Sequence, residues 1–253
     1  MTNQFKNKTI LVTGAASGMG KAMVKKLVDK GARVYACDWN ENGLAEFLES
    51  SNISVIKLDV SSSSACNAVA EQIVKERGRL DGMVNFAGVI KRTGILDCTD
   101  EDFDYVMKVN VYGTFYLTRA IAQVMLRQGS GSIVNVSSVW STIGASGVLA
   151  YCTSKGAVSQ LTRSSALDLA GTGVRINEIR PGETNTAMLA SERKGTFTKE
   201  DIAKKLKEIA VSIPEKRLAD PEEMANAALF LLSDESSYIQ GSSITVDGGY
   251  SAQ

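Results

Sequence analysis

The sequence contains no histidine among its 253 residues. That absence excludes the Ser-His and Cys-His arrangements that activate a nucleophile, so proton transfer must fall to Tyr, Lys, Asp, Glu or Cys. Cysteine is scarce as well, and no CxxC pair begins a zinc site. The cysteines are Cys37, Cys66, Cys98 and Cys152. We therefore expect no bound metal and interpret these side chains as reduced structural thiols.

Net charge and long apolar runs are also missing. With 28 basic and 28 acidic side chains the formal net charge is zero, so no global field attracts nucleic acid or an anionic membrane. No apolar run reaches the roughly 18 residues that span a bilayer. Residues Met1 to Lys8 lack the apolar core of a signal peptide. The sequence thus predicts a cytoplasmic protein whose partner is a small molecule.

What is present is an alternation of short β-branched runs with longer amphipathic stretches. This alternation is typical of repeated βαβ units around a parallel sheet with helices on both faces. We predict strands at Thr9–Val12, Arg33–Cys37, Val55–Leu58, Met83–Asn85, Ser132–Val136, Arg175–Ile179 and Ser243–Val246. We predict helices at Gly20–Lys30, Glu101–Arg127, Tyr151–Ala170, Lys199–Ala210 and Glu222–Leu232.

No linker, repeat or low-complexity segment divides the chain, so residues 1–253 are expected to form one domain. One stretch departs from the alternation of strands and helices. Glu183–Lys216 joins the sixth predicted strand to the last predicted helix. Because long connections in compact domains usually carry function, we interpret this stretch as a lid over the substrate.

A glycine-rich turn follows the first predicted strand directly. It reads Thr13-Gly14-Ala15-Ala16-Ser17-Gly18-Met19-Gly20 and opens the first helix. Glycines let the chain turn sharply and let a pyrophosphate approach the helix N-terminus, where free N–H groups favour negative charge. A tight turn alone would explain such a cluster. Its place in a βαβ unit favours dinucleotide binding, with Gly14, Ser17, Gly18, Met19 and Gly20 against the cofactor.

Asp38 ends the second predicted strand, 18 residues after Gly20. A carboxylate at this point accepts hydrogen bonds from the ribose hydroxyls of an adenosine and repels a 2′-phosphate. No basic residue stands at Ala15, Ala16 or Trp39, from which a cation could attract that phosphate. The pattern favours NAD over NADP, with Asp38 and Trp39 beside the adenosine. The alternative is a solvated aspartate at a strand end.

Further motifs follow along the chain. They are Asp59-Val60, Asn85-Phe86-Ala87-Gly88, Asn110, Ser137-Ser138, Tyr151-Cys152-Thr153-Ser154-Lys155, Pro181-Gly182 and Asp247-Gly248-Gly249. Their order and spacing resemble those of the short-chain dehydrogenase/reductase family. The resemblance covers essentially the whole chain. It implies a single-domain Rossmann fold of the α/β class, with a doubly wound, seven-stranded parallel sheet, and it implies an NAD-dependent oxidoreductase.

The resemblance also implies cofactor contacts, carried over residue by residue. Asp59 and Val60 would face the adenine, while Asn85, Ala87 and Gly88 would pass close to the ribose. The residues implied along the nicotinamide are Pro181, Gly182, Thr184 and Thr186.

The sequence departs from the family pattern at three places. Phe86 replaces a second asparagine, which we expect to remove local hydrogen bonds rather than chemistry. Thr184 stands where Ile or Val is common. Arg180 and Glu183 are expected to place charge beside the nicotinamide pocket.

Tyr151 and Lys155 lie four residues apart on a predicted helix, so their side chains project from one face. An unperturbed phenol titrates at about 10, and we expect the Lys155 ammonium and the positive nicotinamide to lower the pKa of Tyr151. Ser138 can donate a hydrogen bond to the substrate oxygen. The resemblance implies that Lys155 holds the nicotinamide ribose and that Asn110 continues the proton path.

The substrate pocket is predicted to contain Ser138, Trp140, Tyr151, Glu183 and Met188. This mixture fits a medium-sized or cyclic secondary alcohol or its ketone, in line with a likeness to cyclic-alcohol dehydrogenases of the family. Sugars, polyols and 3-oxoacyl carrier-protein substrates stay open. A non-catalytic NAD-binding sensor also stays open, although it would be expected to lose Tyr151 or Lys155. The family likeness further implies a homotetramer formed through the helices at 101–127 and 151–170.

Overall fold

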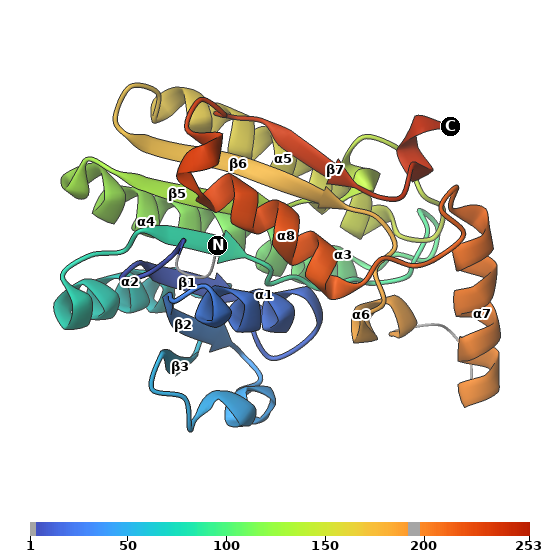
Figure 1. The fold of residues 1–253 in the computed structure, drawn as a ribbon. Coiled ribbons are helices and arrows are strands. Elements are labelled where there is room, and N and C mark those ends of the chain that lie inside the picture. The colour runs from blue at the N-terminus through green and yellow to red at the C-terminus, as the bar shows by residue number, and fades with distance from the viewer. Residues whose placement is uncertain (1–3, 192–197) are drawn as a thin grey trace.

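The strands of the computed structural model form one parallel sheet (Figure 1), and the structure describes residues 4–191 and 198–253. The strands are β1 (Thr9–Thr13), β2 (Arg33–Asp38), β3 (Ile53–Lys57), β4 (Gly82–Asn85), β5 (Gly131–Val136), β6 (Val174–Pro181) and β7 (Ser243–Val246). Their order is β3-β2-β1-β4-β5-β6-β7. The winding direction reverses between β1 and β4, so the predicted doubly wound, seven-stranded sheet is confirmed.

Helices cover both faces of this sheet (Figure 1). They are α1 (Gly18–Asp29), α2 (Ser63–Arg77), α3 (Asp100–Met107), α4 (Gly113–Gln128), α5 (Leu149–Asp168), α6 (Ala187–Ala190), α7 (Lys199–Ser212) and α8 (Pro221–Leu232). Helices α1 and α8 pack on one face, and α2, α4 and α5 pack on the other. Among the described residues, no helix is both long and apolar enough to cross a membrane.

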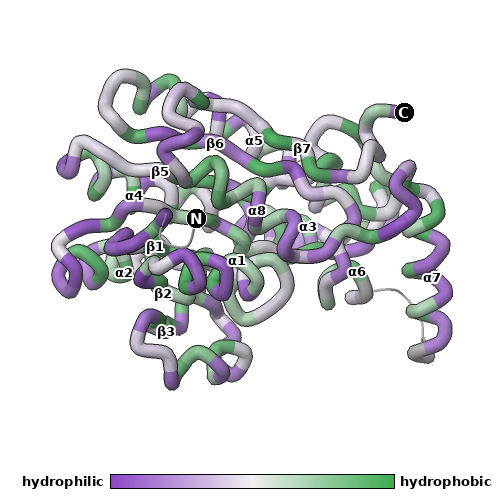
Figure 2. The backbone as a smooth tube through the Cα atoms, viewed as in Figure 1, coloured by the Kyte–Doolittle hydropathy of each residue, from purple (hydrophilic) through white to green (hydrophobic). Residues whose placement is uncertain are grey.

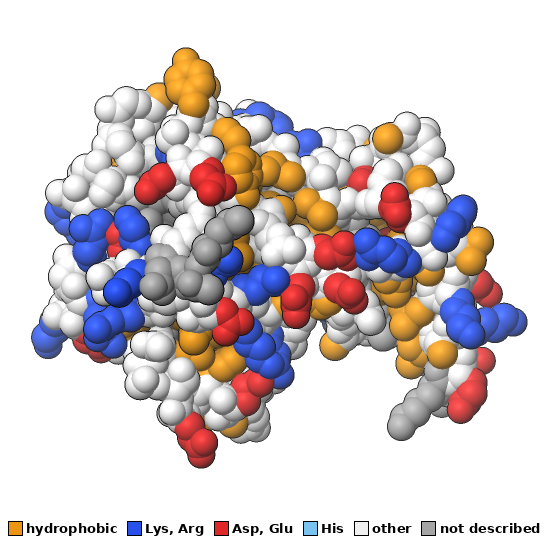
Figure 3. Space-filling model, viewed as in Figure 1, with side chains coloured by type: hydrophobic (Ala, Val, Ile, Leu, Met, Phe, Trp, Pro, Cys, Tyr) orange, Lys and Arg blue, Asp and Glu red, His pale blue; other side chains and the backbone are white. Residues whose placement is uncertain are grey.

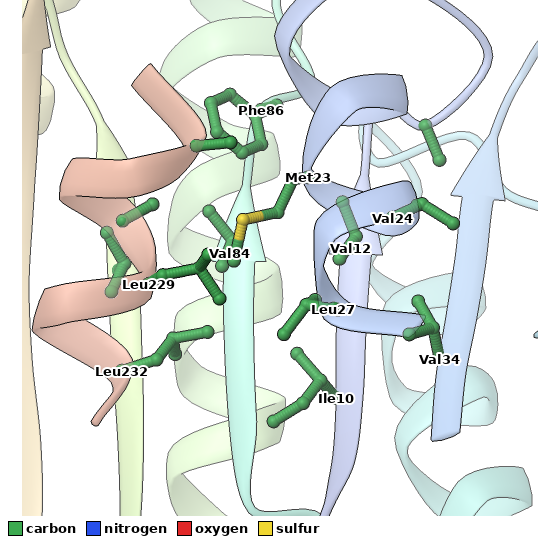
Figure 4. Packing of buried hydrophobic residues seen from close by; sticks show 14 of the residues in the cluster. Ile10, Val12, Met23, Val24, Leu27, Val34, Val84, Phe86, Leu229 and Leu232 are labelled. Atoms are coloured by element: carbon green, nitrogen blue, oxygen red, sulfur yellow. The ribbon is translucent and has the colours of Figure 1, made fainter. Parts of the chain in front are cut away.

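Alternate strand residues supply the two halves of the core. Figure 4 shows Met23 and Leu27 of α1 facing Leu229 of α8 above the strand residues Ile10 and Val84. Neighbouring strand positions turn to the opposite face, where Leu11, Tyr35 and Met83 pack against α2 and α4. Burial on both faces explains the apolar runs of β1 and β4. Figure 2 shows hydrophilic and hydrophobic residues following one another along α7 at the edge of the molecule.

The prediction of one continuous helix over Glu101–Arg127 is wrong at its centre. A wider turn of π-helix, Lys108–Tyr112, separates α3 from α4. The backbone N–H of Gly113 reaches back to the Lys108 oxygen, and the hydroxyl of Thr114 donates to the Asn110 oxygen at 2.7 Å. The widened turn thus lies at Asn110, where a side-chain hydrogen bond to the backbone accompanies it.

The predicted lid, residues 183–216, contains α6 and α7, while residues 192–197 lie outside the described part. Helix α7 begins with a capping box, because Thr198 accepts from the Asp201 N–H and the Asp201 carboxylate accepts from the Thr198 N–H. Figures 1 and 3 show α7 standing away from the body of the protein at one end. The lid segment therefore follows β6 at the carboxyl edge of the sheet.

The turn between β1 and α1 depends on close backbone contact. A Cβ atom added at Gly20 would lie 2.6 Å from the carbonyl carbon of Gly14, and closer still to its oxygen. Because backbone atoms cannot rotate out of the way, no side chain fits at this position. The start of α1 is thereby held against the end of β1.

We expect Gly20→Ala to lower the free energy of unfolding by about 1–3 kcal/mol, because the turn must open to admit the methyl group. Gly156→Ala on α5 is the matched control, since its added Cβ would be 3.9 Å from the nearest atom. That control should be neutral or stabilising by about 0.5–1 kcal/mol, as expected for alanine in a helix. Urea unfolding measures both variants, and equal stabilities would contradict the assignment of a tight turn.

Candidate active site

The carboxyl ends of β1, β2 and β4 open into a cleft of about 510 Å³. The cleft lies where the strand order reverses, which is the usual ligand position in an open α/β sheet. The predicted cofactor residues that line it are Gly14, Ser17, Gly18, Met19, Gly20, Asp38, Trp39, Asp59, Val60, Ala87, Gly88 and Thr186. Segments far apart in the sequence thus meet around one elongated space.

Two glycines of the turn after β1 lie too close to their neighbours to carry a side chain. A Cβ atom at Gly14 would lie 2.8 Å from the Phe86 carbonyl carbon, and one at Gly18 would lie 3.0 Å from Thr186 Cγ2. Ser17 precedes α1 without a capping hydrogen bond from its side chain. The first N–H groups of α1 therefore suit an anionic group such as a pyrophosphate.

Asp38 is held in a fixed orientation at the end of β2. Its Oδ2 accepts from the Ala16 N–H at 3.0 Å, and its Oδ1 accepts from the Asn40 N–H at 2.9 Å. Trp39 beside it is 73% exposed and forms part of the cleft rim. The cleft-lining residues within 37–40 and 58–61 include no Arg or Lys. This end of the cleft therefore presents a carboxylate with no nearby cation from those segments.

Asn85 does not line the cleft, although it was predicted to pass close to the ribose. It is buried, its Oδ1 accepts from the Thr13 hydroxyl at 2.6 Å, and its Nδ2 donates to Thr114 Oγ1 at 3.1 Å. It ties β1, β4 and α4 together beneath the cleft. Phe86, next in the chain, packs into the core beside α1 and reaches the cleft wall.

A smaller cavity adjoins the cleft and is lined by ten of the predicted site residues. Those residues are Ser138, Trp140, Tyr151, Lys155, Pro181, Gly182, Glu183, Thr184, Thr186 and Met188. The two spaces share the lining residues Met19, Phe86, Gly88, Thr186 and Met188, so they lie side by side. Groups predicted for the nicotinamide, the substrate and the chemistry are therefore brought together.

Tyr151 and Lys155 face this cavity from successive turns of α5. The Lys155 Nζ lies 5.5 Å from the centre of the Tyr151 ring. The Trp140 ring meets the Tyr151 ring edge to face, with the centres 5.9 Å apart. Stacking by Trp140 limits the orientations open to the phenol.

Burial raises the pKa of Tyr151 above its ordinary value. A hydrogen bond with the Ser138 side chain and the charge of Arg92 act in the opposite direction, while the charge of Glu183 adds to the rise. In the chain without cofactor, desolvation of the phenolate outweighs the nearby charges. The expected lowering of the pKa of Tyr151, which relied on the positive nicotinamide as well as on Lys155, stays a prediction. The phenol is protonated at neutral pH.

Burial lowers the pKa of Lys155 to about 8, and the negative charge of Glu178 opposes the fall. Lys155 is 5% exposed, and its Nζ donates to the Val136 oxygen at 2.8 Å. A group with this pKa is about nine-tenths charged at pH 7 and about one-tenth charged at pH 9. An ammonium beside the phenol is the main form at neutral pH.

Asn110 lies behind the cavity and touches neither of the two spaces. Its Oδ1 accepts from the Val89 N–H at 2.8 Å, and its Nδ2 donates to the Val89 oxygen and to Ser154 Oγ, both at 2.9 Å. A Cβ at Gly88 would lie 3.3 Å from Asn110 Oδ1 and 3.6 Å from Lys155 Nζ. Asn110 thus fixes the segment after β4, and Gly88 keeps the space beside Lys155 open.

The two neighbouring serines take different directions. Ser138 lines the cavity, bonds Tyr151 and accepts from the Trp140 N–H at 3.2 Å. Ser137 bonds the Lys155 oxygen and Ser159 beneath α5. The geometry therefore agrees with the choice of Ser138, rather than Ser137, as the partner of Tyr151.

One charged residue lies elsewhere than the sequence analysis placed it. Arg180 turns away from the cavity and pairs with Glu178 at 2.8 Å, whereas Glu183 lines the cavity as expected. Arg92 also lines the cavity, from a segment that is neither helix nor strand.

These features define an α/β fold of the Rossmann type with a cleft at its switch point. The glycine turn and the carboxylate at the end of β2 line this cleft, and Tyr151, Lys155 and Ser138 line the adjoining cavity. A family model described as "Enoyl-(Acyl carrier protein) reductase" matches residues 14–251. The chain belongs to the short-chain dehydrogenase/reductase family of oxidoreductases, whose members use NAD or NADP.

Relatives match over nearly their whole length. The 3-oxoacyl-[acyl-carrier-protein] reductase FabG of Thermotoga maritima is 36% identical over 252 residues, which cover 97% of this chain and 98% of that protein. Cyclopentanol dehydrogenase of Comamonas sp. is 36% identical over 251 residues, with coverage of 97% and 98%. The ligand-free structure of Thermoplasma acidophilum aldohexose dehydrogenase is 32% identical, has a TM-score of 0.90, and is matched over 98% of this chain and 95% of its own.

Proposed function

We propose that this protein is an NAD-dependent oxidoreductase that interconverts a secondary alcohol and its ketone, with Tyr151 as the general acid and base. The observation that carries the proposal is that two spaces adjoin. The phenol of Tyr151, with Ser138 and Lys155 beside it, lines a cavity that shares five lining residues with the cleft of the glycine turn. This arrangement supports a proton donor next to a bound dinucleotide.

Different residues would hold different parts of the proposed cofactor. Gly14, Gly18 and the start of α1 would hold the pyrophosphate, Asp38 the adenosine ribose, and Lys155 the nicotinamide ribose. Pro181 and Gly182 would lie along the nicotinamide. When bound, the nicotinamide supplies or accepts the hydride at the substrate carbon.

The chain itself moves the proton. In reduction, the Tyr151 O–H bond breaks and the proton passes to the substrate oxygen, which Ser138 holds by donating a hydrogen bond. In oxidation, the Tyr151 oxygen accepts the hydroxyl proton of the substrate. The Lys155 ammonium, 5.5 Å from the ring centre, stabilises the phenolate that reduction leaves behind. The raised pKa of Tyr151 favours the acid form that starts reduction.

Tyr151→Phe should lower turnover by roughly 10²–10⁴-fold, because it removes the hydroxyl that is proposed to exchange this proton. Binding of NAD should change little. The assay follows nicotinamide absorbance with a panel of cyclic and acyclic secondary alcohols and ketones, and fluorescence titration measures cofactor binding. Tyr238→Phe, at a fully exposed tyrosine, is the matched control. Near-normal turnover in Tyr151→Phe would remove Tyr151 from the mechanism.

The proposed preference for NAD rests on the fixed carboxylate of Asp38. Two backbone N–H groups hold its oxygens at the end of β2, and the adjoining cleft segments supply no cation. A 2′-phosphate would bring like charges together in a space with restricted water. NAD carries hydroxyls at that point, which suit a carboxylate acceptor.

Asp38→Asn should raise the ratio of NADP-linked to NAD-linked kcat/KM by about tenfold or more, which corresponds to about 1.4 kcal/mol of removed repulsion. The amide keeps an acceptor for one backbone N–H group, so the fold should be retained. Asp29→Asn, at the exposed end of α1, makes the same change of net charge away from the cleft. An unchanged cofactor ratio in Asp38→Asn would show that selectivity lies elsewhere.

The substrate lid is proposed to span residues 183–216, and Arg92 fastens its described first part to the body. The Arg92 Nε donates to the Ser191 oxygen at 3.0 Å, and one Nη donates to the oxygens of Leu189 at 3.2 Å and Met188 at 3.4 Å. These carbonyls lie at the end of α6, where a cation is favoured. Because Met188 and Leu189 line the cavity, Arg92 sets the position of its apolar wall.

Arg92→Lys should raise the KM for substrate by about tenfold, since an ammonium cannot span three carbonyls in the fixed fork of a guanidinium. The affinity for NAD should change less, because the glycine turn and Asp38 are untouched. The exposed Arg163, which bonds Gln160 within its own helix, supplies the control Arg163→Lys. Steady-state kinetics measure the substrate KM of both variants. An unaltered KM in Arg92→Lys would contradict the proposal that Arg92 fastens the lid.

The apolar lining favours a cyclic or medium-sized alcohol as the substrate. Ile90, Val139, Trp140 and Leu189 contribute to the wall, and a relative is named cyclopentanol dehydrogenase. Other relatives are named for an acyl carrier-protein substrate and for aldohexose, so the panel includes sugars and acyl thioesters. Three exposed apolar side chains support the proposed homotetramer, namely Tyr112 at the end of the π-helical turn, Phe115 on α4 and Leu167 on α5.

A further inference from the structure

A buried carboxylate lies on the α5 side of β6, outside both spaces of the site. Glu178 is 1% exposed, and its Oε1 accepts from Ser159 Oγ at 2.8 Å, Ser243 Oγ at 2.6 Å and Arg180 Nε at 2.8 Å. Oε2 is buried too and has no hydrogen-bond partner within the described part of the chain. An oxygen that accepts from three donors is in the ionised form, so a negative charge lies beneath the site.

Two hydroxyls connect this carboxylate to the backbone of Lys155. Ser159 Oγ lies 2.8 Å from Ser137 Oγ, which lies 2.9 Å from the Lys155 oxygen. Together with the bond between Ser159 and Glu178, these contacts make three pairs of oxygen atoms within hydrogen-bond distance. The hydroxyls of Ser137 and Ser159 supply only two hydrogens for them. Because Glu178 accepts, Ser159 gives its hydrogen to the carboxylate, and Ser137 serves either Ser159 or the Lys155 oxygen. The chain of hydroxyls is thus oriented by Glu178.

The electrostatic partner of Lys155 in this region is Glu178. Burial lowers the pKa of Lys155, and the charge of Glu178 opposes that fall. Strands β5 and β7, which flank β6, contain no ionisable side chain. The other charged or titratable groups that face the pair are Tyr151 on α5, Arg180 on β6, and Glu183 and Arg92, which act on Tyr151.

We propose that Glu178 is a positioning residue that keeps Lys155 charged by its own buried negative charge, while Ser159 and Ser137 hold the two elements in register. It lines neither the cleft nor the cavity, so any effect of Glu178 on the reaction would pass through Lys155. The inference rests on the role of Lys155 in the proposed function. Figure 1 shows α5 and β6, the two elements that this contact joins.

The competing explanation is purely structural. Glu178 and Ser243 are paired in the register of β6 and β7, so the carboxylate could serve only to join these strands. In that case its loss would lower stability and leave the ionisation of Lys155 unchanged. The two explanations therefore differ in a measurable property of Lys155.

The test is Glu178→Gln, with Lys155 titrated by NMR of ¹³Cε-labelled lysine in the cofactor-free protein and its signal assigned with Lys155→Arg. Loss of the negative charge should move the midpoint of Lys155 to lower pH, so that the charged fraction at pH 8 falls from about one half to about one tenth. The alkaline limb of turnover with NAD should move in the same direction. Glu76→Gln on α2 is the control with the same change of net charge.

Further variants separate charge from structure. Ser159→Ala breaks the hydroxyl chain but keeps the carboxylate, so it should leave the Lys155 midpoint close to that of the parent protein. An unmoved midpoint in Glu178→Gln, or an equal movement in Ser159→Ala, would establish the structural explanation instead. If Glu178→Gln does not fold, Arg180→Gln carries the test with the opposite sign, because loss of the neighbouring cation should move Lys155 to higher pH.

The titration needs neither cofactor nor substrate, so its outcome is independent of the proposed reaction. If Tyr151→Phe kept its turnover while Lys155 still responded to Glu178→Gln, the reaction would be wrong and the electrostatic coupling right. If Tyr151→Phe lost turnover and Lys155 did not respond, only the coupling would be wrong.

Discussion

The hydrogen bonds of Asn85 are the constraint on which the site depends. This one amide joins Thr13 at the end of β1 to Thr114 on α4, at the point where the winding of the sheet reverses. The strands on either side continue into loops that diverge, and the divergence creates the cleft. A side chain beneath the floor, which touches no ligand space, therefore determines where the ligand space opens.

A second layer of support is provided by helix α5. It brings Tyr151 and Lys155 to one cavity, and the bond from Lys155 Nζ to the Val136 oxygen fixes the helix against the end of β5. The widened turn at Asn110 fixes the opposite wall, because the Asn110 amide holds Val89 and also bonds Ser154 of α5. The site is thus positioned by polar contacts between elements that are adjacent in space and distant in sequence.

Much of this architecture follows from local patterns that a sequence displays. The period of the apolar residues predicted every strand, and the errors are confined to ends, as in Val55–Leu58 against the observed Ile53–Lys57. The glycine turn and the spacing of Tyr151 and Lys155 likewise predicted residues that the structure brings together, although their roles remain predictions. These features are local, so a short stretch of sequence is enough to predict them.

The features that sequence reasoning missed are set by tertiary contacts. The widened turn at Asn110 lies inside a regular helical pattern, and Arg92 donates hydrogen bonds to carbonyls almost one hundred residues away in the sequence. Burial, which no local spacing records, raises the pKa of Tyr151 in the chain without cofactor. The predicted position of Arg180 was wrong for the same reason, because its side chain turns toward Glu178 and forms an ion pair with it.

The lowered pKa of Lys155 has a consequence for a chain that lacks histidine. Histidine is the side chain that ordinarily senses acidity in the physiological range. Here the amine of Lys155, with a pKa of about 8, titrates in the upper part of that range. It is buried next to the phenol of Tyr151. The protein would therefore be insensitive to mild acidification at this group but responsive to alkalinisation, the reverse of a histidine-based sensor.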